Sequence, residues 1–87
     1  MDYTIDNYRD MAIEYRLTAT SILQNIMRKE KLVKKSGLPQ GYKDELKEEI
    51  TTLKSTYNSL IDLEMIMIDK MEEMKKKRAE TQKAKTD

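Results

Sequence analysis

The chain of 87 residues contains no cysteine, histidine, tryptophan or phenylalanine, and it has only two glycines and one proline. Without cysteine or histidine it lacks a thiolate nucleophile, an imidazole base and the side chains that dominate zinc and iron–sulfur sites. Gly37 and Gly41 do not form the glycine-rich loops that bind nucleotide phosphates. We therefore expect no enzymatic activity, no metal ion, no cofactor and no small-molecule substrate.

The sequence also lacks a long hydrophobic run. No stretch approaches the roughly 18 apolar residues that a membrane-spanning helix needs. The first residues are acidic, whereas a signal peptide has a basic segment followed by an apolar one. We therefore expect a cytoplasmic protein that does not associate with membranes.

Charged residues and hydrophobic residues each make up 38% of the chain, a composition typical of long helices and coiled coils. Hydrophobic residues recur at alternating steps of three and four in two segments, which predicts two amphipathic helices. The first helix is expected over about residues 5–35, with Thr4 as its N-cap and Gly37 as the left-handed residue that ends it. A connector over 36–41 contains Pro39 and leads to a second helix over about 42–78. Residues 79–87 are expected to form a frayed or disordered basic tail.

The short connector forces the two helices to lie antiparallel as neighbours. Folding the chain about Pro39 places small residues of the first helix opposite large residues of the second. The predicted fold is therefore an all-α antiparallel hairpin with coiled-coil-like helices. Its expected register pairs Ile26 with Leu53, Ile22 with Tyr57, Ala19 with Leu60, Ala12 with Met67 and Tyr8 with Met71.

More apolar residues are present than one seam between two helices can hold. The stretch 60–68 is apolar nearly all round, which in a water-soluble helix indicates contacts on more than one side. The simplest cover is a second copy of the chain, which would form a homodimeric four-helix bundle, although a tetramer is also open. The residues predicted to form the interface with a second copy or another partner are Ile13, Leu17, Leu23, Met27, Ile61, Leu63, Met65, Ile66 and Ile68.

Glu64 is the one charged residue that interrupts the apolar positions of the second helix between Leu46 and Met74. The hairpin register places it across from Tyr15 and one step from Arg16. An inward carboxylate must be paired or kept neutral, so we expect a hydrogen bond from Tyr15 or an ion pair with Arg16. Such a polar contact in an apolar seam sets the register rather than carrying out chemistry.

Four successive basic residues, Lys75, Lys76, Lys77 and Arg78, allow two interpretations. They would complement the C-terminal end of the helix dipole, or they would bind nucleic-acid phosphates. The net charge of +1 favours the structural interpretation. We therefore expect a protein–protein interaction module, such as an adaptor, inhibitor or small regulatory subunit, and a nucleic-acid-associated regulator is the alternative. The sequence does not identify the partner or the biological process.

Residues 15–37, followed by 44–50 and 60–63, resemble the N-terminal helical hairpin of small prophage-encoded regulators from low-GC Gram-positive bacteria. The resemblance implies a phage or mobile-element origin for the helical hairpin. Those regulators continue into a sigma-factor-like helix-turn-helix, whereas this chain ends in a lysine-rich segment. The resemblance therefore implies no DNA-reading residue here.

Overall fold

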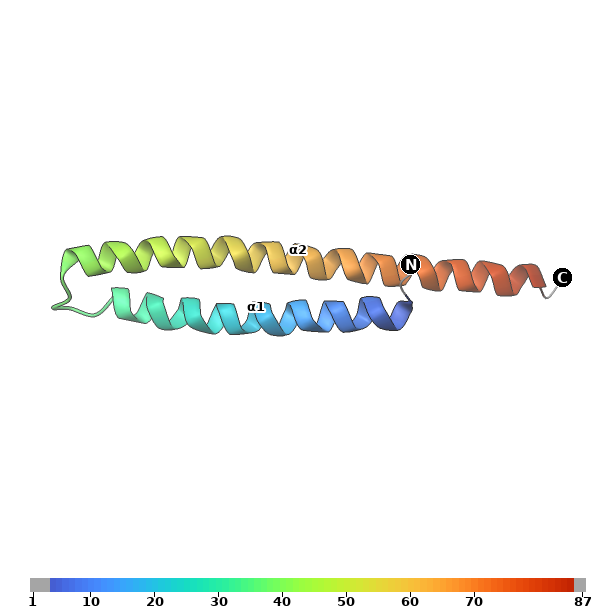
Figure 1. Ribbon diagram of the computed structural model, residues 1–87, viewed down its shortest axis with the longest axis horizontal. Coiled ribbons are helices and arrows are strands. Elements are labelled where there is room, and N and C mark those ends of the chain that lie inside the picture. The colour runs from blue at the N-terminus through green and yellow to red at the C-terminus, as the bar shows by residue number, and fades with distance from the viewer. Residues whose placement is uncertain (1–3, 86–87) are drawn as a thin grey trace.

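The computed structural model consists of two helices, α1 (Ile5–Val33) and α2 (Gln40–Lys85), which lie side by side and antiparallel (Figure 1). It describes the backbone of residues 4–85 and the side chains of residues 4–79. The predicted all-helical hairpin is therefore confirmed. The predicted four-helix bundle requires a second chain, so it remains a proposal.

The start of α1 is fixed by a reciprocal pair of hydrogen bonds. The Asn7 backbone N–H donates to the Thr4 hydroxyl oxygen at 3.2 Å, and the Thr4 backbone N–H donates to the Asn7 side-chain oxygen at 3.0 Å. This capping box satisfies two backbone donors that would otherwise lack partners at a helix start. Thr4 is thus the N-cap that the sequence predicted.

The connector differs from the prediction at the end of α1. The helix ends at Val33 rather than near residue 35, and the Lys35 N–H donates to the Leu32 carbonyl at 3.1 Å. Gly37 has a left-handed φ of +88°, but it lies beyond the C-cap residue Lys34 instead of directly following it. The left-handed residue therefore turns the connector rather than closing the last turn of α1.

The second helix is longer than predicted at both ends. It begins at Gln40 rather than about 42, directly after Pro39, whose carbonyl accepts the Lys43 N–H at 3.1 Å. It continues to Lys85 rather than ending near 78, because residues 79–85 include alanine, glutamate, glutamine and lysine and no helix breaker. The expected frayed tail thus begins as helix, and its residues 86 and 87 lie outside the described part of the chain.

Two ion pairs between the helices match the predicted register of the seam. The Arg16–Glu64 and Lys29–Glu49 ion pairs join the two helices in the predicted register, at 2.8 and 2.6 Å. At the open end of the hairpin, the ion pairs of Asp6 and Asp10 are both made with Arg9 of the same helix. The buried apolar side chains of the described residues are Ala12, Ala19, Ile26, Leu46 and Ile50.

The hairpin is a rod rather than a compact domain. Its principal extents are 74 × 19 × 14 Å, and its radius of gyration is 20.3 Å. A compact domain of this length would have a radius of gyration of about 12 Å. Each helix therefore has a single neighbour, and most of its circumference faces away from the seam.

The two glycines give a matched pair of substitutions with opposite expected effects. A Cβ atom would meet nothing within 4 Å at either Gly37 or Gly41, so only the backbone conformation distinguishes them. Gly37→Ala should lower the free energy of unfolding by about 1 kcal/mol, because an L-residue is strained at a left-handed φ. Gly41→Ala should raise it by about 0.5–1 kcal/mol, because alanine is the better helix former. Urea unfolding of both variants checks this, and a shift of the same sign in both would contradict the connector geometry.

Candidate interaction surface

The seam of the hairpin follows a seven-residue repeat in which positions a and d face the other helix. In α1, position a is occupied by Ala12, Ala19 and Ile26, all of which are buried. In α2, position a includes Ile50 and Glu64, which are also buried. Once position a is assigned, every other residue of the two helices takes a position from b to g. Each exposed residue can therefore be placed on one side of the hairpin.

Positions e and b of both helices lie on one side of the hairpin. Glu30 and Lys54, which are both at position e, form an ion pair across the seam at 3.5 Å. Position b neighbours position e on a helix surface, because residues three and four apart lie on the same side. We call this side of the hairpin the e/b face.

The e/b face carries most of the apolar residues that the sequence predicted for an interface. Ile13 is 50% exposed, Met27 is 54% exposed and Met65 is 57% exposed, although all three are large apolar side chains. Contiguous exposed apolar surface of this kind marks interaction sites in soluble proteins. The predicted interface residues on this face are Ile13, Leu23 and Met27 of α1 and Ile61, Met65 and Ile68 of α2, of which Ile61 alone is half-buried.

The other three predicted interface residues lie elsewhere. Leu63 and Ile66, at positions g and c, are exposed on the opposite side of the hairpin, and Leu17, at position f, points away from the seam. The sequence analysis predicted all nine residues as one interface. In the structure, six of them lie on the e/b face and three lie on other parts of the surface. Tyr42, which is 43% exposed at the start of α2, was not in the predicted set.

Among the described residues, Glu64 is the one charged residue that is buried. It pairs with Arg16. The Arg16 Nε donates to the Glu64 Oε2 at 2.8 Å. The Glu64 residue is 7% exposed, whereas the Arg16 side chain is 58% exposed at position e. The carboxylate is thus held inside the seam by a guanidinium that lies on the e/b face.

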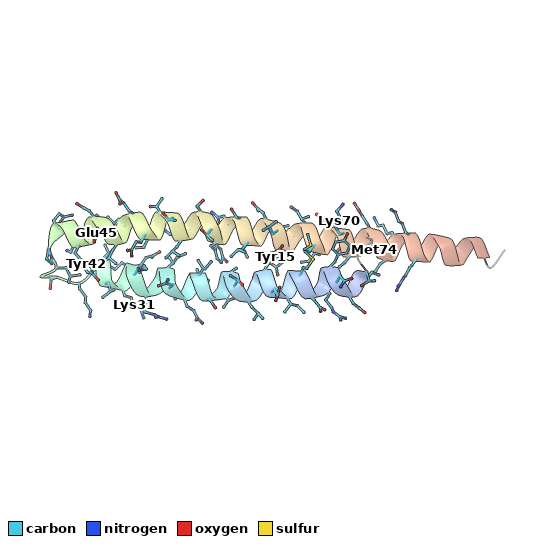
Figure 2. The ribbon with its side chains drawn as sticks, in the orientation of Figure 1. Tyr15, Lys31, Tyr42, Glu45, Lys70 and Met74 are labelled. Atoms are coloured by element: carbon cyan, nitrogen blue, oxygen red, sulfur yellow. The ribbon has the colours of Figure 1, made fainter. Side chains whose placement is uncertain are left out.

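The hydrogen bond to Glu64, followed by the attraction of its negative charge, raises the pKa of Arg16. A cation whose pKa is raised in the folded state stabilises the fold at pH values below its unfolded-state pKa. This stabilisation is lost only as the pH rises through the folded-state pKa. For an arginine this happens only at strongly alkaline pH. The contribution of Arg16 to this pair therefore holds throughout the neutral range. Tyr15, the other expected partner of Glu64, is half-buried between the two helices (Figure 2).

The basic run 75–78 lies where α2 extends past α1. Met74 marks the open end of α1, and α2 continues beyond it as a single helix (Figures 1 and 2). Lys75, Lys76, Lys77 and Arg78 are exposed. We call residues 75–85 the overhang. Among the described residues, α1 does not run beside this segment of α2 (Figure 1).

The hollows along the rod are wide open to solvent. One of them is a groove of about 500 Å³ near the connector, and both residues of the Lys29–Glu49 ion pair line it. Small-molecule sites are usually enclosed, whereas this groove is open to solvent. Within the described residues there is no group of acidic side chains that would hold a metal ion, and neither helix is long and apolar enough to cross a membrane. The groove is lined by Asn25, Lys29, Glu45, Glu48, Glu49, Thr52 and Leu53.

Comparison of the chain with models of protein families, with curated proteins and with solved structures gives no match. The resemblance to prophage regulators therefore stays a prediction. The surface of the hairpin itself is therefore what points to a function.

The Arg16–Glu64 pair predicts an asymmetric response to mutation. Arg16→Met should lower the free energy of unfolding, because it leaves a buried carboxylate without its partner. Glu64→Leu should give a protein at least as stable as the wild type, because it replaces a buried polar position by an apolar one that fits the seam. In the double variant, the loss caused by Arg16→Met should largely disappear. Chemical unfolding of the three variants measures this, and equal losses for both single variants would contradict it.

Proposed function

We propose that the chain is a non-enzymatic protein–protein interaction module that self-associates through its apolar helix faces, most simply as a homodimeric four-helix bundle. The observation that carries this proposal is that large apolar side chains are more often exposed than buried. The described residues include five buried apolar side chains, two of which are alanines, and nine large exposed ones. A folded protein in water ordinarily has the opposite balance.

The accessible surface supports the same conclusion. The chain exposes 7051 Å² for a mass of 10.3 kDa. A folded monomer of this mass exposes about 5,400 Å², so the excess is roughly 1,600 Å². Each partner in a standard protein–protein interface buries about 800 Å². The hairpin therefore has enough surplus surface for an interface of ordinary size.

The loss of chain entropy on folding also favours a partner that buries more apolar surface. Ordering a residue costs about 1–2 kcal/mol, and a small domain must offset this by burying apolar surface. The seam buries Ile26, Leu46 and Ile50 together with small alanines. A second layer of helices against the e/b face would bury six further apolar side chains. A self-associated hairpin of this kind would serve another protein as an adaptor, inhibitor or small regulatory subunit.

A nucleic-acid-associated regulator is the alternative, and the exposed basic run 75–78 is the observation that favours it. Phosphate binding releases counterions, so it weakens steeply as salt increases. Single-stranded nucleic acid would also require stacking on aromatic side chains, whereas Tyr8, Tyr15 and Tyr57 lie half-buried along the seam. Micromolar binding of DNA or RNA at about 150 mM salt that is lost in a Lys75→Glu/Lys76→Glu variant would replace our proposal by this alternative.

Self-association predicts that the wild-type protein is a dimer at micromolar concentration by sedimentation equilibrium. A variant carrying Ile13→Lys and Met65→Lys should dissociate at least about 100-fold more readily, because it places unpaired charges in an apolar interface. Thr18→Lys is the matched control, since it adds a lysine at an exposed polar position away from the e/b face. A wild-type monomer that unfolds cooperatively would overturn the proposal.

A further inference from the structure

The ion pairs across the seam fix the level of each residue along the rod. Arg16–Glu64 and Lys29–Glu49 join residues of α1 and α2 whose numbers add to about 80. Other residues whose numbers add to about 80 therefore also lie level. In a dimer with a two-fold axis, the same surface of both copies meets itself. If that axis runs along the rod between two e/b faces, α1 of each copy lies against α2 of the other, and the levels do not change.

The apolar residues of the e/b face match one another in this parallel dimer. Ile13 of one copy is level with Ile68 of the other, and Leu23 lies about one helical turn from Ile61. Three of these four side chains are exposed on the single hairpin, and Ile61 is half-buried. The two-fold axis makes each contact occur twice. The dimer would therefore cover apolar surface that a single hairpin leaves in water.

Charged residues of the e/b face also match at the open end of the hairpin. Asp6 and Arg9 form an ion pair at 3.5 Å, and both are exposed. In the parallel dimer Asp6 is level with Lys75 of the other copy, and Arg9 is level with Glu72. Asp6 and Glu72 occupy position b, whereas Arg9 and Lys75 occupy position e, so all four lie on the e/b face. Opposite charges therefore face each other, which favours this orientation of the two copies.

An axis across the rod would instead give an antiparallel dimer, in which α1 lies against α1 of the other copy. Aligning Ile13 with Leu23 of the other copy then also aligns Asp6 with Glu30, which are like charges. A shift by one heptad in either direction separates these carboxylates but aligns Ile13 with a charge, either Glu30 or Arg16. The α2 segments would still bring apolar residues together, so it is the α1 segments that disfavour the antiparallel dimer.

The parallel dimer also brings some like charges to the same end, at a small cost. Both overhangs lie at the open end, but in a four-helix bundle α2 of one copy is diagonal to α2 of the other. Neighbouring helix axes 8–10 Å apart give a diagonal of about 11–14 Å, which exceeds the Debye length of about 8 Å at physiological salt. At the connector end Lys47 is level with Lys34 of the other copy, while Glu30 of that copy lies about one turn from Lys47. The apolar contacts and the opposite charges of the open end therefore outweigh these repulsions.

We propose that two copies pair in parallel through their e/b faces, about a two-fold axis along the rod, so that α1 of each copy lies against α2 of the other. This inference rests on the proposed self-association and specifies its geometry. Both connectors then lie at one end of the bundle and both overhangs at the other. Each helix gains a second antiparallel neighbour, and the e/b face becomes the second seam of the bundle.

Distances between spin labels test the orientation, and the absence of native cysteine allows single-cysteine labelling. Glu48→Cys, Asp62→Cys and Lys76→Cys are exposed positions that all occupy position f, outside the e/b face. In the parallel dimer the distances between equivalent labels should agree to within about one helical turn, 5 Å, at all three positions. An antiparallel dimer would make one of the three distances exceed another by about 20 Å or more, which would overturn the geometry alone. No dipolar signal at any position would overturn self-association itself.

Charge reversal tests whether Arg9 faces Glu72 of the other copy. Arg9→Glu and Glu72→Arg should each weaken the homodimer by about 3- to 10-fold, because like charges then face each other twice. An equimolar mixture of the two variants restores both opposite pairs, so native mass spectrometry should find about 75–90% heterodimer instead of the statistical half. Arg28→Glu and Glu73→Arg are the matched control, since they make the same changes of charge at exposed c positions on the opposite side, and their mixture should stay close to half. Equal heterodimer fractions in the two mixtures would overturn the parallel geometry.

Discussion

Two helices share a single seam, and this limits how much apolar surface a hairpin can bury. In this chain two of the buried seam positions are held by Ala12 and Ala19, whose small side chains bury little apolar surface. The remaining apolar residues are consequently displaced to positions flanking the seam. The apolar e/b face and the extended shape both follow from this single constraint. The proposed second layer of helices, from another copy of the chain, would cover these residues.

The pairing of Arg16 with Glu64 links the seam to this outer surface. A buried carboxylate in an apolar seam tolerates little sliding of one helix along the other, because a shift of one turn would separate it from its partner by about 5 Å. The guanidinium that holds it lies at position e, among the apolar residues of the e/b face. The pair is therefore suited to fix the register of the hairpin while placing a charge on the proposed interface.

The sequence predicts the hairpin well because the periodic spacing of apolar residues reports directly on which residues face the seam. It also identifies Thr4 as the N-cap and places Glu64 inward beside Arg16, because both depend on local spacing and on one short connector. The helix ends were less predictable. Residues 79–85 have few apolar side chains, so periodicity fails there, although their helix propensity is high. The division of the nine interface residues between two sides required the Glu30–Lys54 contact, which shows which flanking positions lie together.

The central claim is that the second layer of helices contributes to the stability of the fold. The most direct test is thermal unfolding followed by circular dichroism at protein concentrations from about 1 to 100 µM, since association of folded chains makes the midpoint depend on concentration. Our account predicts that the midpoint rises by about 5–10 °C over this range. A cooperative transition with the same midpoint at every concentration would show that the single hairpin is sufficient, and would contradict the account.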